Sequence, residues 1–287
     1  MDNIANATAD LRLETFPLGL ISTRHPLKRS CSFVAKEPQD VSLTIAAAEN
    51  STLPTASDMT LLFGLVHYSQ LGGLKDKTFE LTRYRICQLI GLQPANENYR
   101  RIMSACTIWE TTAFKLERTW NEEGGDLKLS REFKVLQTRR GPKGEVIITW
   151  TNAFWNALKS GSWATTDLSK AIQFRPTTRQ LYCFVCGRFR ETPRFEVEAR
   201  QLAHQHLGLS PRMPLGRMLQ ETRSCIEEIE KVGALPPLAP KERIKRQEPG
   251  VWLVRFEQSL RETKAAGGIR SSPLAAGPCV EAGKPEM

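Results

Sequence analysis

The side chains best suited to chemistry in this sequence are arginines on a helix that begins near Asn96. Four residues recur there at spacings of three and four and predict its buried face: Tyr99, Ile102, Cys106 and Trp109. This face leaves Arg100, Arg101 and Ser104 turned outward. Because a guanidinium donates paired hydrogen bonds to phosphate oxygens or to a guanine edge, the helix is a candidate for nucleic-acid contact. The alternative is a solvated face on which the arginines pair with Glu97.

A second arginine-bearing helix begins near Pro214. Its expected inward stripe consists of Leu215, Leu219, Ile226 and Ile229. Arg217, Gln220 and Arg223 lie away from that stripe, so they form a second candidate contact face.

Basic residues also gather at a predicted hairpin tip. Arg139, Arg140 and Lys143 flank a Gly-Pro pair, which favours a turn, and they suit a hairpin that grips backbone phosphates. In the second half a similar basic group follows the arginine-bearing helix: Lys241, Arg243, Lys245 and Arg246. These residues either contact phosphates as well or make a linker soluble.

The candidate residues belong to a pattern that occurs twice: a short helix, a tight break, a longer helix with arginines, and a basic strand pair. The first copy runs from Thr82 to Lys143 and the second from Val197 to Arg246. A helix-turn-helix followed by a hairpin wing places its second helix in the DNA major groove. The sequence therefore predicts an α+β fold of two tandem winged-helix domains.

A composition shift near Gly161 marks the expected domain boundary. We expect a first winged-helix domain with N-terminal strands at residues 1–160 and a second at 161–262. Residues 263–287 are rich in Gly, Ala, Pro and Ser, which predicts a disordered tail.

Strand signals occur at three places in the predicted first domain. Ser32–Ala35 and Val41–Ile45 are short strand-like pieces near the start. From Ala113 to Trp150, β-branched and aromatic residues predict one meander, with a hairpin signal at Gly124–Gly125. We expect this meander to supply the wing.

The overall composition favours a polyanionic partner. The 287 residues carry a formal charge of +9, and basic side chains that neutralise phosphates release condensed counterions. The sequence has no secretory signal and no run near the ~18 apolar residues of a membrane span. We therefore expect a cytoplasmic protein without a membrane segment, whose seven scattered cysteines act mainly as small buried hydrophobes.

Two motifs suggest metal or strand-transfer chemistry, and neither fits well. Cys183 and Cys186 form a C-x-x-C pair followed by His204 and His206, but a zinc finger requires three to five residues between its histidines. A metal-dependent DNA-nicking enzyme would need both histidines on one face of a strand, whereas the flanking residues favour a helix.

A nicking enzyme would also need a tyrosine nucleophile. The four tyrosines fall in expected apolar helical stripes: Tyr68, Tyr84, Tyr99 and Tyr182. No phosphate-binding loop or hydrolase motif occurs. We therefore predict no catalytic residue, no metal and no cofactor.

Several segments, in order, resemble the plasmid replication initiator protein A family and, more broadly, plasmid initiators that bind origin repeats. The similarity spans about Ser57 to Leu235 and includes Phe79-Glu-Leu-Thr82, Tyr99-Arg-Arg-Ile102, Arg179-Gln-Leu-Tyr-Cys-Phe184 and Pro214-Leu-Gly-Arg-Met-Leu219. The resemblance implies two winged-helix domains that bind origin repeats and help open adjacent AT-rich DNA. It also implies recruitment of the host initiator and of the replicative helicase or its loader, and a possible homodimer. Gly216 departs from the family, whose members tend to carry a larger residue there.

These observations favour a sequence-specific, double-stranded DNA-binding initiator without enzyme activity, associated with a plasmid or the nucleoid. A winged-helix transcription regulator is the first alternative, and a metal-dependent nicking enzyme acting through His204 and His206 is the second. The repeats and basic helices fit the first two equally well, whereas the histidine spacing argues against the third.

Overall fold

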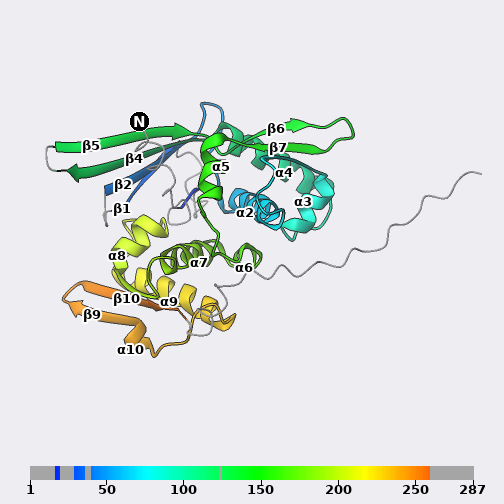
Figure 1. Ribbon diagram of the computed structural model, residues 1–287. Coiled ribbons are helices and arrows are strands. Elements are labelled where there is room, and N and C mark those ends of the chain that lie inside the picture. The colour runs from blue at the N-terminus through cyan, green and yellow to red at the C-terminus, as the bar shows by residue number, and fades with distance from the viewer. Residues whose placement is uncertain (1–16, 20–28, 36–39, 123–124, 259–287) are drawn as a thin grey trace, which may run out of the picture.

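The structure, a computed structural model, describes residues 17–19, 29–35, 40–122 and 125–258. Helices and strands are mixed along the chain, as expected for an α+β protein. Within these residues, three antiparallel sheets and the helices packed against them make up the architecture (Figure 1). The expected tail at 263–287 and the Gly124 hairpin tip lie outside the described residues.

The first half contains seven strands and four helices within its described part. They are β1 (Ser30–Ala35), β2 (Asp40–Ala46), α2 (Ala56–Leu71), β3 (Thr78–Leu81), α3 (Arg83–Leu89), α4 (Asn96–Thr111), β4 (Ala113–Glu122), β5 (Gly125–Phe133), β6 (Leu136–Arg140), β7 (Val146–Trp150) and α5 (Asn152–Lys159). The short strands predicted at Ser32–Ala35 and Val41–Ile45 are confirmed as β1 and β2.

The predicted single meander is wrong, because its strands divide between two sheets. β4 and β5 join the N-terminal strands in a four-stranded sheet of order β1-β2-β4-β5. β6 and β7 pair instead with β3, in the order β3-β7-β6. The division arises because β2 pairs with β4, although helices separate the two strands in the sequence. In this pairing Leu43 lies opposite Leu116, and Ile45 lies opposite Phe114. The β6–β7 hairpin alone is therefore the candidate wing.

Helix α2 is the centre of the first half. Its first turn is closed by Thr55, whose backbone N–H donates to the Asp58 carboxylate at 2.7 Å. Trp109 of α4 donates its indole N–H to the Asp58 carbonyl at 2.8 Å, and Trp150 of β7 donates to Ser69 at 2.9 Å. Both bonds are buried, so they fix α4 and the three-stranded sheet against the same helix.

The second half repeats part of this order: a strand, two helical segments and then a strand pair. It contains α6 (Leu168–Gln173), α7 (Pro176–Phe189), β8 (Arg194–Glu198), α8 (Ala199–Gln201), the π-helix η2 (Leu202–His206), α9 (Leu215–Lys231), α10 (Pro240–Arg243), β9 (Ile244–Glu248) and β10 (Val251–Glu257). Its sheet has the order β8-β10-β9. In both three-stranded sheets, then, the first strand in the sequence pairs with the last, and the last also pairs with the middle one. The repeat read in the sequence is a repeat of topology.

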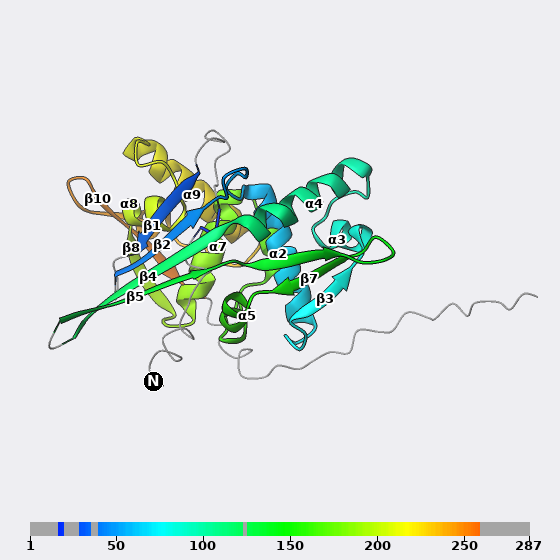
Figure 2. The ribbon, with the colours of Figure 1, turned by 90° about the horizontal axis from the view of Figure 1, so that it is seen from above.

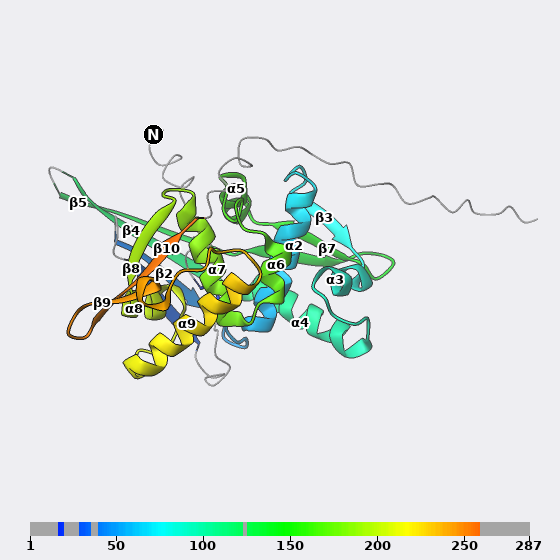
Figure 3. The ribbon, with the colours of Figure 1, turned by 90° about the horizontal axis from the view of Figure 1, so that it is seen from below.

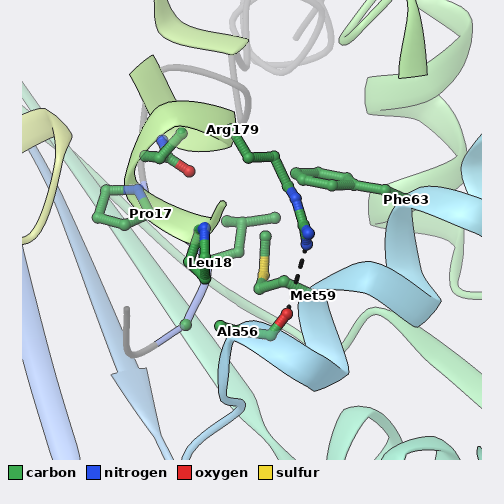
Figure 4. Close-up of a pocket in the computed structure, with 9 residues that line it drawn as sticks. Pro17, Leu18, Ala56, Met59, Phe63 and Arg179 are labelled. Carbon is green, nitrogen blue, oxygen red and sulfur yellow. Dashed lines mark hydrogen bonds between the residues drawn. The ribbon is translucent and has the colours of Figure 1, made fainter. Parts of the chain in front are cut away.

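The helices of both halves form one continuous layer. Figures 1 and 3 show α2, α6 and α7 between α4 on one side and α9 on the other. Arg179 of α7, only 7% exposed, joins the halves (Figure 4). Its guanidinium donates to Thr60 of α2 at 2.7 Å and to the Ala171 and Phe174 carbonyls at the end of α6, at 3.1 and 3.2 Å. It also lies 5.8 Å from the centre of the Phe63 ring.

The segment between the halves is held from both sides. Trp163 is buried against Phe63 and Phe154, and its carbonyl accepts a hydrogen bond from Gln70 of α2 at 3.0 Å. Arg190 after α7 donates to the Gly161 carbonyl at 2.5 Å. The division into domains near residue 160 stays a prediction, although the connection that it requires is well packed.

No helix in the described ranges is both long and apolar enough to traverse a lipid bilayer.

Candidate nucleic-acid interface

Two short backbone signals set the angle between α3 and α4. Thr82 begins α3 by accepting a hydrogen bond from the Arg85 N–H at 3.1 Å. Gly91 ends the turn with a φ of 71°, a conformation that favours glycine. The chain then restarts as α4 at Asn96. A helix, a tight turn and a second helix are thus confirmed for the first half.

The buried and exposed faces of α4 agree with the sequence prediction. Ile102, Cys106 and Trp109 are buried, with Tyr99 half-buried beside them. Arg100, Arg101 and Ser104 are all exposed. Arg101 is oriented along the helix by a hydrogen bond that it donates to the Asn98 side chain at 3.2 Å. The expected pairing of these arginines with Glu97 is absent from the ion pairs of the described residues.

An open groove lies between α3, α4 and β6. Three arginines reach it from three different elements, and the lining consists of Arg83, Asn96, Tyr99, Arg100, Met103 and Arg140. The Arg83 guanidinium packs over the Tyr99 ring, 5.3 Å from its centre. Sequence analysis missed Arg83. Its position directly after the Thr82 cap, at the start of a helix that precedes the arginine-bearing one, was the available signal.

The β6–β7 turn carries the predicted basic residues, but it does not bring all of them together. Successive strand residues face opposite sides of a sheet, so Arg140 lines the groove while Arg139 lies on the other face. Lys143 is exposed in the turn, where its backbone N–H donates to the Glu145 carboxylate at 2.9 Å. Figure 2 shows this hairpin projecting from the end of the molecule near α3 and α4.

A constant spacing relates the second half to the first. The separation of Phe79 from Phe195, each in the first strand of its sheet, equals that of Ile102 from Met218, which are both buried. The same separation relates three further pairs, in the order first half then second half: Arg101 and Arg217, Ser104 and Gln220, Arg100 and Gly216. Arg217, Gln220 and Arg223 are exposed on α9, as predicted. The arginine facing the groove has no equivalent, because glycine occupies its place.

The predicted inward stripe of α9 is correct only in its second part. Ile226 and Ile229 are buried, whereas Leu215 and Leu219 are half-buried. The buried line at the beginning of the helix runs instead through Met218 and Thr222. The leucines flank this line. An α-helix has 3.6 residues per turn, so residues spaced four apart drift away from a straight line along the helix.

The basic residues after α9 have different roles. Arg243 is buried and donates to Glu230 at 2.6 Å and to the Arg255 carbonyl at 2.8 Å, so a phosphate contact for it is wrong. Lys245 and Arg246 are exposed on β9. Arg246 pairs with Trp252 of β10, one residue beyond the Leu253 that faces the last residue of β8, so the hairpin tip extends past its sheet.

The two candidate helices share one side of the molecule. Figures 2 and 3 show α4 and α9 along the same long edge, α4 toward the β6–β7 turn and α9 toward the β9–β10 turn. The two turns lie at opposite ends in all three ribbon views. The two helices that carry the exposed arginines therefore lie along one edge.

An ion cluster fastens α9 to the start of α7. Arg175 donates to Glu221 at 2.7 Å and to Glu228 at 2.9 Å, and the Thr178 hydroxyl donates to Glu228 at 2.7 Å. Burial alone would raise the pKa of the Glu228 carboxyl, but the hydrogen bonds from Thr178 and Arg175 hold it below its usual value. These acidic side chains bind the helix in place and leave Arg217 and Gln220 outside.

The His204 and His206 side chains belong to a π-helix rather than a regular helix. His206 is buried, with its ring centre 4.3 Å from that of Phe184, and His204 lies 3.2 Å from the Leu209 carbonyl. In the described ranges, no group of three or more His, Cys, Asp or Glu side chains could hold a metal ion.

The cysteines that the structure describes are mainly buried, as predicted. Burial, with a smaller contribution from Glu110, raises the pKa of Cys106 to about 12, and burial likewise raises the pKa of Cys225 to about 11. Such thiols remain protonated at neutral pH. Among the tyrosines, the prediction for Tyr84 is wrong, because this residue is 52% exposed on α3. Its hydroxyl accepts a hydrogen bond from Gln88 at 3.1 Å.

Comparison with known proteins reveals a shared fold. No protein-family model and no curated protein matches the sequence. The crystal structure of domains 2–3 of RctB, a replication initiator of Vibrio chromosome II, matches with a TM-score of 0.54 and 15% identity, over 86% of this chain and 97% of that one. A selenomethionine crystal structure of the same two domains gives 0.54 and 16%, over 74% and 82%. At this identity the likeness establishes a common fold.

Proposed function

We propose that this protein is a DNA-binding replication initiator built from two tandem winged-helix domains, of the type that binds origin repeats. The observation that carries the proposal is the repeated exposed pair: Arg101 with Ser104 on α4, and Arg217 with Gln220 on α9, at one spacing and along one edge. The order of helices and strands in each half suits a winged helix. A shared fold with initiator domains adds support.

Membership of the plasmid initiator family is the finer part of this proposal. It rests on the quoted segments between Ser57 and Leu235, and it would place the protein on plasmid origin DNA in the cytoplasm. The same family resemblance leads us to propose contacts with the host initiator and the replicative helicase or its loader, and a homodimer that is separate from the DNA-bound form. We propose no enzyme activity, because the candidate histidines are engaged with Phe184 and Leu209.

The proposal is tested by footprinting the purified protein on the DNA that flanks its gene. We expect protection of tandem direct repeats of about two helical turns, near an AT-rich segment, and a linear fall of log K with log salt concentration. Protection of a lone palindrome would identify a transcription regulator instead. Equal binding to the repeats and to a shuffled sequence of the same composition would refute sequence-specific origin binding.

A double variant sharpens the assignment to α4. Arg100→Ala with Arg101→Ala should weaken binding to the repeats by at least about 1 kcal/mol. The charge-matched control is Lys75→Ala with Lys159→Ala. Both lysines are exposed, and Lys75 precedes β3 at the end of the sheet remote from the β6–β7 turn. Equal losses in the two double variants would show that only total charge matters.

A further inference from the structure

No acidic side chain neutralises the three groove arginines, in contrast to several arginines elsewhere in the described chain. Arg175, Arg188, Arg194, Arg243 and Arg255 each form an ion pair. Within the part of the chain that the structure describes, Arg83, Arg100 and Arg140 form none, and no Asp or Glu lines their groove. Three cations facing one space repel each other, so the groove favours an anion.

The rigidity of the surroundings gives this groove a defined shape. The Arg83 guanidinium packs against the Tyr99 ring, and a buried hydrogen bond from Trp109 fixes α4 to α2. Arg140 is the last residue of β6 and pairs with Val146 of β7. Arginines from a helix start, a helix side and a strand end therefore line one groove. Planar forks arranged in this way suit the several oxygens of one phosphate group.

The geometry also separates Arg100 from its neighbour. Asn96, Tyr99, Arg100 and Met103 of α4 line the groove, whereas Arg101 does not. Arg101 and Ser104, three residues apart, lie on a common ridge. A base-reading ridge and a phosphate-facing groove thus lie side by side on α4.

We propose that Arg83, Arg100 and Arg140 form one phosphate-binding site, which holds a single backbone phosphate of duplex DNA. The site sets the depth at which α4 enters the DNA major groove. This inference rests on the proposed DNA-binding function, and it assigns Arg100 to the backbone and Arg101 to the bases. The second half lacks the site, since the buried Ala199 matches Arg83 and the exposed Gly216 matches Arg100.

The test measures binding of Arg83→Ala, Arg140→Ala and Arg101→Ala to a repeat duplex and to a shuffled duplex across a salt series. Arg83→Ala and Arg140→Ala should weaken both duplexes by the same factor and lower the slope of log K against log salt by about 0.9 or less each. Arg101→Ala should weaken mainly the repeat. A loss confined to the repeat in Arg83→Ala would overturn the site, because a phosphate contact is insensitive to sequence.

A second measurement tests whether the site is single. Neutral methylphosphonates are placed one at a time along the repeat, and the position that weakens binding by the wild-type protein is mapped. Both Arg83→Ala and Arg140→Ala should lose part of their sensitivity at one shared position, because one of three cations is removed, whereas Lys75→Ala should retain the wild-type response. Two different positions, or unchanged sensitivity, would overturn the proposal.

The two proposals fail in distinguishable ways. If the wild-type protein binds repeat and shuffled duplexes equally, the proposed function fails, while the slope of Arg83→Ala on the shuffled duplex still tests the phosphate site. If the wild-type protein prefers the repeat and Arg83→Ala matches it in affinity and slope, the phosphate site alone fails. Circular dichroism and thermal midpoints equal to those of the wild type establish that each variant is folded.

Discussion

The helix that precedes the arginine-bearing one differs between the two halves. In the first half it is the regular α3, capped by the neutral Thr82, with Arg83 at its start. In the second it is the three-residue α8 followed by a π-helix, and the cap is Glu198, which accepts from the Arg200 and Gln201 N–H groups at 3.1 and 2.9 Å. A carboxylate at that helix start already complements the amide groups to which a phosphate would bind.

The arginines follow the same division. In the first half the groove arginines face solvent without acidic partners, whereas in the second Arg175 and Arg243 are bound to Glu221, Glu228 and Glu230. One topology thus supports two electrostatic designs. On the proposed function, the first half would anchor on the DNA backbone, whereas the second half uses Arg175 and Arg243 to hold its own helices and hairpin in place.

The largest effect should come from uncoupling the halves at Arg179. Arg179→Met leaves the carbonyls of Ala171, Ile172 and Phe174 without this donor, and it should lower the free energy of unfolding by about 2–4 kcal/mol. Urea denaturation followed by tryptophan fluorescence measures the change. Arg188→Met, on the same helix but in a half-exposed ion pair with Glu191, is the control and should cost under about 1 kcal/mol. Equal losses would contradict a special role for the buried arginine.

The next effect compares the matched positions on the two helices. Arg101→Ala and Arg217→Ala should each weaken binding to the repeat by about 1–3 kcal/mol, and each should relax preference at different base pairs. A panel of singly substituted repeats, titrated with both variants, separates the two sets. Preferences that change at the same base pairs, or an Arg217 variant with wild-type affinity, would show that the second half does not read sequence.

A smaller effect is expected where the second half lacks an arginine. A Cβ at Gly216 meets nothing within 4 Å, so Gly216→Ala should stabilise α9 by up to about 1 kcal/mol. Gly216→Arg should gain less stability, because a cation opposes the dipole at a helix start. It should nevertheless bind any duplex more tightly, with a salt slope steeper by up to about 0.9. Identical DNA affinity in the Ala and Arg variants would mean that this position faces away from the backbone.

The smallest effect concerns the acidic cluster that holds α9. Since the pKa of Glu228 is lowered in the folded protein, its contribution is complete above the unfolded value of about 4.3 and is lost as the pH falls through the folded value. The Glu228→Gln variant should be less stable than the wild type by under about 1 kcal/mol, because water screens this half-exposed pair. This difference in stability should therefore shrink on acidification. Thermal midpoints between pH 7 and about 3 test this, with the exposed Glu227→Gln as control. A difference that grows in acid would reverse the assigned sign.

Local patterns predicted a large part of the fold and of the candidate interface. Spacings of three and four correctly separated Ile102 and Trp109 from Arg100 and Arg101, because burial on a helix follows its period. The predicted break between the two helices is local as well, because the Thr82 cap and the Gly91 stop each act within one helical turn.

Features that depend on distant partners could not be predicted in this way. The choice of β4 by β2 and the pairing of Arg243 with Glu230 join segments whose proximity no local spacing encodes. The opposite facing of Arg139 and Arg140 needed the boundaries of β6, and the insertion that makes η2 a π-helix leaves no clear residue signal. The groove was missed because Arg83, Arg100 and Arg140 come from three separate elements.

The Arg179 junction constrains the spacing of the half-repeats that the protein could bind. The Arg179 guanidinium of α7 joins α2 and the end of α6, and so it ties together the elements that carry α4 and α9. On the proposed function, the two helices would meet the double helix at one fixed relative angle. Inserting about five base pairs between the two half-repeats would rotate one half-repeat to the far side of the duplex, whereas about ten would restore the phase. Affinity would therefore vary with the length of the spacer, with a period of one helical turn of DNA.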